Sequence, residues 1–208
     1  MVLLFIGPSG SGKDTQAQLL QDKFDFKILS SGELLRDISV GNTIMETSIR
    51  RALNEGIILD QLVYALLQIY LEYSQLKNFI LTGFVRSANQ IHKLDSCLYD
   101  IGTELTKVVY FKLTDEVAIK RMSGRMVDKR NGKIYHSQLN PPPQDAIPFL
   151  EKRPDDSVTD SYLKRLREFH RDNVEIIHDY NKRSLLMSVD ASKSIEEIHD
   201  ELIKDLNL

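Results

Sequence analysis

The chain has a single cysteine, Cys97, and it has no long uninterrupted apolar run. One cysteine cannot form an internal disulfide and cannot supply a zinc site built from several cysteines, so we expect a reducing compartment and no structural zinc. No apolar run approaches the roughly 18 residues that a membrane span requires, and the first residues are an apolar strand rather than a basic leader. We therefore expect a cytoplasmic protein that has no membrane partner.

Charge of one sign is also scarce, because the net charge of the 208 residues is only −3 and Lys and Arg do not gather in one run. Binding to nucleic acid usually requires a basic patch, so we expect small-molecule partners and no nucleic acid. The histidines show no metal-ligand spacing and are assigned to surface or packing roles. They are His92, His136, His170, His178 and His199.

Short apolar runs alternate with amphipathic segments along the chain. This alternation predicts a parallel sheet covered by helices. The predicted strands lie near residues 2–6, 26–29, 79–82, 108–113 and 185–189. The last helix is predicted to start with a capping box of Ser194 and Glu197. One of its faces should pack in the core, with Ile195, Ile198, Leu202, Ile203 and Leu206.

Two segments interrupt this alternation of strands and helices, and they divide the chain into a core and two insertions. Residues 30–59 read as a small lobe with two short helices, and residues 122–156 read as an inserted flap. Within the flap, "KRNGKIYH" predicts a hairpin that turns at Asn131-Gly132. The core would then consist of residues 1–29, 60–121 and 157–208.

A glycine-rich loop directly follows the first predicted strand. In "GPSGSGKDT" the glycines let backbone N–H groups converge on phosphate oxygens, and the next helix directs its positive end at them. This pattern predicts that a nucleoside triphosphate contacts Gly7, Ser9, Gly10, Ser11, Gly12, Lys13, Asp14 and Thr15. Asp14 stands where such loops usually carry Ser or Thr, so a cation is needed between its carboxylate and the phosphates.

Further motifs occur along almost the whole chain. They are "SSGELLR", "TGFVRSANQ", "RMSGRM", "GKIYHSQLNPPP" and "RPDD". Their order and spacing resemble those of the adenylate kinase family of nucleoside monophosphate kinases. The resemblance implies a three-layer αβα P-loop fold with a five-stranded parallel sheet, in which residues 30–59 are the NMP-binding lobe and residues 122–156 the lid. It also implies reversible Mg²⁺-dependent transfer between ATP and AMP, which gives two ADP, and a monomeric enzyme.

The resemblance implies a role for each arginine in these motifs. Arg36 and Arg86 would hold the acceptor phosphate, while Arg125 and Arg153 would close over the donor phosphates. Arg121 would lie beside the donor base, and Tyr135 would also belong to the ATP site. A further arginine is expected after "RPDD", where Arg165 is favoured and Lys164 is the alternative. No general base is expected, because the attacking phosphate oxygen is already ionised near neutral pH.

The acceptor base is expected to be adenine. Gln90 can both donate to and accept from an adenine edge, and Leu35 would pack against the base. Ser31 occupies a position where adenylate kinases commonly carry Thr and pyrimidine-specific relatives carry Ala. The implied AMP site is completed by Gly32, Ile58 and Gly83. A kinase for UMP, CMP or a deoxynucleoside monophosphate is the alternative within the same class.

The motif after the strand near residues 79–82 departs from the family pattern at two residues. The family's Asp-Gly-Phe-Pro-Arg reads here as Thr82-Gly83-Phe84-Val85-Arg86. The Asp that usually helps to hold Mg²⁺ is therefore Thr82, whereas Asp14 adds a carboxylate in the loop. We hypothesise that the metal-binding carboxylate has moved to Asp14. A nucleotide-binding module with impaired catalysis is the alternative to a working enzyme.

Overall fold

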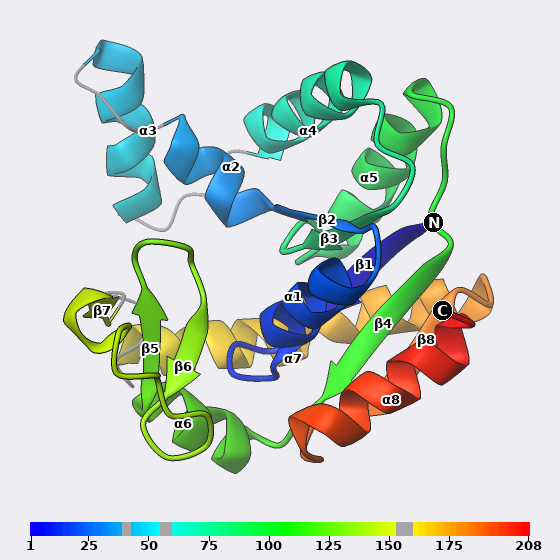
Figure 1. Ribbon diagram of the computed structural model, residues 1–208. Helices are drawn as coiled ribbons and strands as arrows, with labels where there is room; N and C mark the ends of the chain where they lie inside the picture. The colour runs from blue at the N-terminus through cyan, green and yellow to red at the C-terminus, as the bar shows by residue number, and fades with distance from the viewer. Residues whose placement is uncertain (39–42, 55–59, 153–159) are drawn as a thin grey trace. The chain divides into compact units, whose positions relative to one another are not determined.

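The computed structural model describes residues 1–38, 43–54, 60–152 and 160–208, which form an α/β fold (Figure 1). One sheet has five strands in the order β2-β3-β1-β4-β8. The strands are β1 (Val2–Ile6), β2 (Lys27–Ser30), β3 (Phe79–Thr82), β4 (Lys107–Lys112) and β8 (Leu186–Asp190). The predicted α/β fold with a five-stranded parallel sheet is confirmed, and each strand lies within one residue of its predicted position.

The first strand has no polar side chain because it lies between β3 and β4 in the sheet. All of its residues are buried, as is usual for a strand of a parallel sheet that is covered on both faces. Thr82 of β3 lies opposite Phe5 of β1 and also opposite Ser30 of β2. The carboxyl ends of these three strands are therefore level, and the loops that follow them leave from one edge of the sheet.

The chain separates into two compact units, each of which is described by itself. Unit 1 contains residues 1–6, 21–109 and 172–187, and unit 2 contains residues 7–20, 110–171 and 188–208.

Unit 1 includes α2 (Ser31–Asp37), α3 (Ile44–Asn54), α4 (Asp60–Ser74) and α5 (Ala88–Asp100). The first two are the short helices predicted for residues 30–59. Val63, Tyr64, Leu67 and Leu71 of α4 are buried, at the spacing of one helix face, and α4 packs against α5 and α2. The ring of Tyr64 lies 6.3 Å from that of Phe84, between ring centroids.

Unit 2 includes the first part of α1 (Lys13–Lys23), α6 (Asp115–Ser123), the first part of α7 (Asp160–Lys182), and α8 (Ile195–Leu206). Met122, Tyr162 and Leu166 form a buried cluster with Ile119 and Leu163. The predicted capping box is present, because Ser194 and Glu197 each accept a hydrogen bond from the other's backbone N–H. Of the five residues predicted for the apolar face of α8, Ile198, Leu202 and Leu206 are buried, whereas Ile195 and Ile203 are only partly buried.

A second sheet in unit 2 lies within residues 122–156, the segment predicted to be a flap and called the flap below. Its strands are antiparallel, in the order β6-β5-β7, with β5 (Arg125–Asp128), β6 (Ile134–His136) and β7 (Leu150–Glu151). A 3₁₀ helix, η1 (Ile147–Phe149), precedes β7. The predicted turn is confirmed: Gly132 has a φ of 73°, and its N–H donates to the carbonyl of Asp128 at 2.8 Å. Glycine suits this position because a side chain rarely adopts a positive φ.

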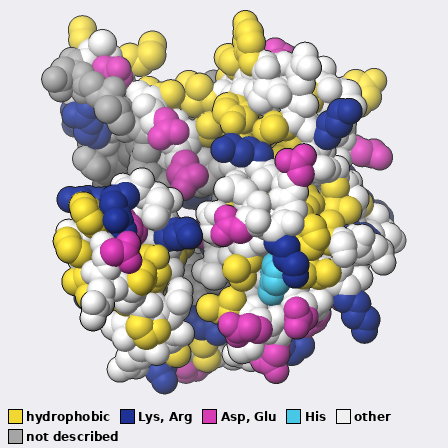
Figure 2. Space-filling view, in the orientation of Figure 1, with side chains coloured by type: hydrophobic (Ala, Val, Ile, Leu, Met, Phe, Trp, Pro, Cys, Tyr) yellow, Lys and Arg dark blue, Asp and Glu magenta, His cyan; other side chains and the backbone are white. Residues whose placement is uncertain are grey.

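On the face shown in Figure 2, Lys and Arg side chains are interspersed with Asp and Glu side chains. This mixture agrees with the even spread of charge along the sequence. Within the described ranges, no helix combines the length and the apolar character that crossing a membrane requires.

Candidate active site

The glycine-rich loop between β1 and α1 belongs to unit 2, and two of its glycines have no room for a side chain. A Cβ on Gly7 would lie 2.6 Å from Ser11 Oγ, and a Cβ on Gly10 would lie 2.9 Å from the carbonyl oxygen of Ala118. Gly10 and Gly12 also have φ angles of 90° and 82°, which glycine adopts without strain. The loop backbone is therefore closely packed, as a nest of N–H groups requires.

Two side chains from distant parts of the sequence hold this loop through its carbonyl groups. The Tyr162 hydroxyl donates to the Ser9 carbonyl at 3.1 Å. Arg121 donates to the Ala191 carbonyl at 2.7 Å and makes a longer contact, 3.5 Å, with the Gly10 carbonyl. These contacts fix the path of the loop backbone from outside, and within the loop the Ser11 N–H donates to the Pro8 carbonyl at 3.1 Å.

Lys13 and Asp14 form the first turn of α1, where N–H groups have no partner within the helix. The Lys13 ammonium group is 3.5 Å from the Pro8 carbonyl oxygen, so it lies over the loop that it is expected to serve. Asp14 and Thr15 are partly exposed. A negative charge at a helix N-terminus is favourable, but Asp14 would oppose a bound polyphosphate unless a cation lies between them.

The guanidinium group of Arg121 is half-buried, and burial lowers its pKa. Its contacts with Gly10 and Ala191 show that this residue, expected beside the donor base, also supports the loop. Arg125 opens β5 and is partly buried, with Nη1 3.7 Å from the sulfur of Met122.

Arg165 and Lys164 differ in their surroundings. Burial raises the pKa of Tyr162 and Asp115 raises it further, while the positive charges of Arg165 and Arg125 act in the opposite direction. Both guanidinium charges therefore act on the hydroxyl that holds the loop. Lys164 is exposed over 71% of its side chain and pairs with Glu168, at 3.8 Å, on the surface of α7. Arg153 lies outside the described residues.

The flap contributes Tyr135, which is partly buried in β6. Its neighbour His136 supports the flap, because its Nδ1 accepts hydrogen bonds from the N–H groups of Gln138 and Leu139, both at 3.0 Å. The ring also fills the space beside Gly124, where an added Cβ would overlap Nε2. Among the described residues, no group of three or more His, Cys, Asp or Glu could hold a metal ion.

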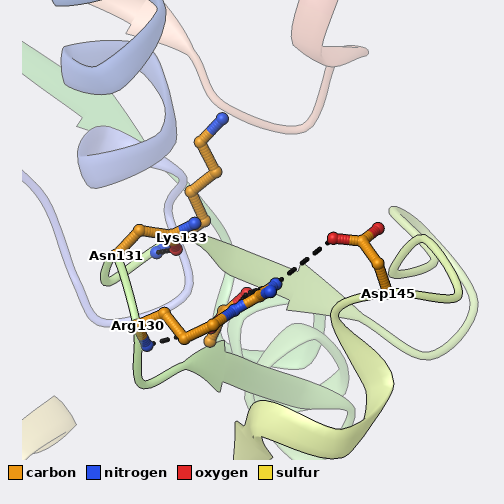
Figure 3. A network of polar contacts seen from close by, with 5 residues as sticks. Arg130, Asn131, Lys133 and Asp145 are labelled. Atoms are coloured by element: carbon orange, nitrogen blue, oxygen red, sulfur yellow. Dashed lines mark hydrogen bonds and ion pairs between the residues drawn. The ribbon is translucent and has the colours of Figure 1, made fainter.

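An ion pair closes the hairpin of the flap (Figure 3). The Asp128 side chain is fully buried and accepts hydrogen bonds from Arg130 Nε and Nη2, with the shortest at 2.6 Å. The hydrogen bond from Arg130 holds the pKa of Asp128 below its ordinary value. Arg130 also approaches Asp145 at 3.4 Å and lies over the Phe149 ring at 4.2 Å. These contacts join β5 to the segment before β7.

The expected acceptor residues lie in unit 1, where the backbone after β3 is held by side chains. Gly83 has a φ of 76°, and its carbonyl accepts from Ser31 Oγ at 2.8 Å and from Arg86 Nε at 3.1 Å. Three of the expected acceptor residues therefore share one carbonyl group. Ser31 is buried and Arg86 is exposed.

Gln90 is 5% exposed and lies in the first turn of α5, as predicted. Its side-chain oxygen accepts from the N–H groups of Arg86 and Ser87, at 2.5 and 3.2 Å. Its side-chain nitrogen donates to Asp60 Oδ1 at 2.7 Å. The expected base-reading residue is thus held on both sides of its amide.

The remaining acceptor residues lie in or near α2. Leu35 is buried, at 5% exposure, and Gly32 is partly exposed. Arg36 belongs to α2, but its side chain is outside the described part of the structure, and Ile58 is outside it altogether. Thr82 ends β3 and is buried.

Four residues that hold the site were not found from the sequence: Asp60, Tyr64, Asp128 and Tyr162. The Tyr64 hydroxyl donates to the Phe84 carbonyl at 2.5 Å, and burial, followed by the charge of Asp60, raises its pKa. Tyr64 and Tyr162 read as core residues because each lies on the apolar face of a helix. Of the four, only Asp128 could have been found from the sequence, because Arg130 follows it two residues later in the turn and indicates an ion pair.

The loop after β1, the helix that begins at Lys13 and the arginines near Tyr162 define a P-loop phosphotransferase. Residues 5–185 match the family described as "Adenylate kinase". The chain is 32% identical to adenylate kinase 4 of Arabidopsis thaliana, over 99% of this chain and 86% of the plant protein. It is 31% identical to the adenylate kinases of Vanderwaltozyma polyspora and Fusobacterium nucleatum, over 98% of this chain and 95% and 97% of theirs. The chain belongs to the adenylate kinase family and is a nucleoside monophosphate kinase.

Proposed function

We propose that this kinase transfers the γ-phosphoryl group of ATP to AMP, reversibly, with two ADP as products. The observation that carries the proposal is the glycine-rich loop, which is packed too closely at Gly7 and Gly10 for side chains and is followed by Lys13. The names of the relatives favour adenylate substrates on both sides.

On the donor side, the loop N–H groups and Lys13 bind the ATP phosphates, with Ser9, Ser11 and Thr15 beside them. Arg125, Arg153 and Arg165 neutralise the charge of the group in transfer, because guanidinium groups bind phosphate oxygens in pairs and stay protonated. Arg121 and Tyr135 lie on the side of the donor nucleoside. The electrostatic effect of Arg125 and Arg165 on the Tyr162 hydroxyl supports this grouping.

On the acceptor side, Arg36 and Arg86 bind the AMP phosphate. The adenine is held by Ser31, Gly83 and Gln90, and packs against Leu35 and Ile58, with Gly32 leaving space at the start of α2. The shared contacts of Ser31 and Arg86 with the Gly83 carbonyl support this assignment for the described residues.

In the reaction, an ionised oxygen of the AMP phosphate forms a bond to the γ-phosphorus of ATP, while the bond from that phosphorus to the β–γ bridging oxygen breaks. ADP leaves with the bridging oxygen, and no proton has to be removed by a base. Positioning and charge neutralisation therefore supply most of the acceleration. The NMP-binding lobe (residues 30–59) and the lid (residues 122–156) close over the core, because water would otherwise accept the phosphoryl group.

Mg²⁺ fits the loop through Asp14. A carboxylate is a preferred ligand of this ion, and Mg²⁺ in kinases is commonly held by one or two carboxylates together with substrate phosphates. When bound, the ion neutralises phosphate charge. Thr82, buried at the end of β3, would contribute at most a hydroxyl group or a water contact.

The metal assignment is tested by the Mg²⁺ dependence of turnover in wild type, Asp14→Asn and the double variant Asp14→Gly/Thr82→Asp. We expect Asp14→Asn to bind Mg²⁺ more weakly, so that half-maximal turnover requires a higher Mg²⁺ concentration. The double variant should return this concentration toward the wild-type value. An unchanged rate and an unchanged Mg²⁺ requirement in Asp14→Asn would show that the carboxylate has not moved.

The activity is tested by steady-state turnover of the purified chain with MgATP and AMP, UMP, CMP or dAMP as acceptor. We expect AMP to be the preferred acceptor and Lys13→Met to remove turnover. Preference for a pyrimidine would make the chain a UMP/CMP kinase, and nucleotide binding without turnover would make it an impaired binding module. We also propose a cytoplasmic monomer, which sedimentation of the purified chain and imaging of a tagged chain would test.

A further inference from the structure

The Gln90 side chain in unit 1 carries an unusual set of hydrogen bonds for a residue expected to read a base. A primary carboxamide offers two lone pairs as acceptors and two N–H groups as donors. Both acceptor positions are used, by the backbone N–H groups of Arg86 and Ser87. One of the two donors is used by Asp60 Oδ1, at 2.7 Å.

Within the described residues, one hydrogen-bonding position of this amide is therefore left, and it is a donor. Gln90 is 5% exposed, so its side-chain amide has little access to water. Turning the amide over would place its NH₂ group against two backbone N–H groups and its oxygen against a carboxylate. Three partners therefore fix the orientation of the amide.

Asp60 is the side chain that fixes the nitrogen end. It is the first residue of α4, and its second oxygen accepts from Lys93 Nζ at 3.0 Å. A carboxylate can only accept, so it holds the Gln90 nitrogen and not the oxygen. Its side chain is 26% exposed, compared with 44% for Lys93. The contact joins α4 to α5 across 30 residues of sequence.

We propose that Asp60 is a positioning residue that leaves Gln90 able only to donate a hydrogen bond to the base of the nucleoside monophosphate. The kinase would then select bases whose purine N1 or pyrimidine N3 accepts a hydrogen bond. Adenine N1 and cytosine N3 satisfy this rule. Hypoxanthine and guanine N1 and uracil N3 carry hydrogen atoms and would meet the Gln90 N–H donor with another donor. This inference rests on the proposed placement of the acceptor base at Gln90.

Wild-type protein provides the first test, with no variant that might fail to fold. AMP, 1-deaza-AMP, IMP, CMP and UMP are compared in two measurements: turnover with MgATP and equilibrium binding by calorimetry. We expect 1-deaza-AMP and IMP to bind about tenfold or more weakly than AMP, because an unpaired buried donor is costly. UMP should be discriminated against relative to CMP in the same way.

The two readouts separate failure of this inference from failure of the proposed function. Turnover of AMP with equal binding of AMP, 1-deaza-AMP and IMP would overturn the inference and leave the proposed function intact. Tighter binding of AMP than of IMP, without any turnover, would reject the proposed activity and support the inference.

Variants at Asp60 test its positioning role. In Asp60→Ala the KM for AMP should rise about tenfold, with kcat changed by less than about twofold, and the preference for AMP over IMP should fall. Asp60→Asn should restore most of both, because its side-chain oxygen can accept from Gln90. Asp95→Ala is the matched control, since Asp95 pairs with Arg183 and makes no contact with Gln90. Loss of stability in Asp60→Ala with an unchanged AMP to IMP ratio would reduce Asp60 to a structural residue.

A double variant reverses the polarity of the pair. In Gln90→Glu/Asp60→Asn the carboxylate introduced on α5 still accepts from the two backbone N–H groups, and the amide introduced on α4 donates to it, so an acceptor faces the base. The ratio of AMP to IMP affinity should then move toward IMP by about tenfold or more. An unchanged ratio in a folded double variant would contradict the proposal.

Discussion

The residues proposed to bind the phosphoryl donor lie in unit 2 (the donor group), those proposed to bind the acceptor lie in unit 1 (the acceptor group), and the two groups are built in different ways. The donor loop is a backbone structure, in which glycines leave no space and distant side chains hold the carbonyl groups of Ser9 and Gly10. The acceptor group depends on a side-chain network, in which Gln90 and Asp60 are held by specific donors and acceptors. Substitutions that add atoms to the loop should therefore reduce activity most in the donor group. Substitutions that exchange a hydrogen-bond donor for an acceptor should reduce it most in the acceptor group.

The largest loss of activity should come from removing the charge of Arg165. Backbone groups of the loop cannot supply a positive charge. Arg165→Ala should lower kcat by about 100-fold to 1000-fold, as removal of a group that stabilises transition-state charge does. Lys164→Ala is the control, since Lys164 pairs with Glu168 on the surface, and it should change kcat less than about twofold. A larger effect of Lys164→Ala in single-turnover assays would transfer the role to Lys164.

A pair of glycine variants tests the comparison directly. A Cβ on Gly10 would meet a backbone carbonyl at 2.9 Å, whereas a Cβ on Gly83 would meet the end of the Ser31 side chain at 2.8 Å. Gly10→Ala should lower kcat/KM for ATP by about 100-fold, because the loop has to shift. Gly83→Ala should raise KM for AMP by only about tenfold, since a side chain can move more easily.

Gly102→Ala controls for backbone strain in this pair. Gly102 has a φ of 73° with no atom within 4 Å of the added Cβ, so its replacement should lower the melting temperature without changing the kinetics. Equal losses for Gly10→Ala and Gly83→Ala would remove the proposed difference between the two groups.

A smaller effect is expected when the hydroxyl that holds the loop is removed. Tyr162→Phe keeps the ring in its cluster with Met122 and Leu166 and removes the hydrogen bond to Ser9. We expect KM for ATP to rise about fivefold, near the value of one hydrogen bond, while KM for AMP stays unchanged. Tyr64→Phe is the opposite control, because its hydroxyl contacts Phe84 in unit 1, and it should affect AMP and not ATP.

The smallest effect concerns the flap, where Asp128 and Arg130 are paired. The pKa of Asp128 is lowered in the folded state by its hydrogen bonds with Arg130, so the pair stabilises the fold above the ordinary aspartate pKa of about 3.9. This stabilisation is lost as the pH falls through the lower pKa of the folded state. Asp128→Asn should reduce the melting temperature by about 3 °C between pH 5 and pH 7, and the difference should shrink below about pH 4.

Thermal unfolding of both proteins across this pH range checks the prediction. A difference that grows on acidification would contradict the assigned direction of the pKa change. Asp145→Asn is a useful control, because Asp145 is 75% exposed and lies 3.4 Å from Arg130, and it should have almost no effect.

The strands were predictable because their signals are local. Val2–Ile6 and Phe79–Thr82 are short apolar runs bounded by turn residues, and both strands have the predicted limits. The turn at Asn131-Gly132 was predictable for the same reason, because a residue with positive φ is readily supplied by glycine. The capping box at Ser194 needed only residues three positions apart.

The partners of the site residues were not predictable from local patterns. The Gln90 amide reaches Asp60 across 30 residues, and Tyr162 reaches the Ser9 carbonyl across 153 residues. The sequence predicts Gln90 as a base-reading residue but leaves its amide able both to donate and to accept. Packing of α4 against α5 removed that freedom, because it brought a carboxylate to the nitrogen end.

The sequence by itself determined the family, the alternation of strands and helices, and the position of the glycine-rich loop, since these depend on residue types at short and regular spacing. Only the tertiary structure decided which atoms of the site residues are already engaged. A hydrogen bond needs a partner within about 3 Å, and chain folding, not sequence proximity, supplies that partner.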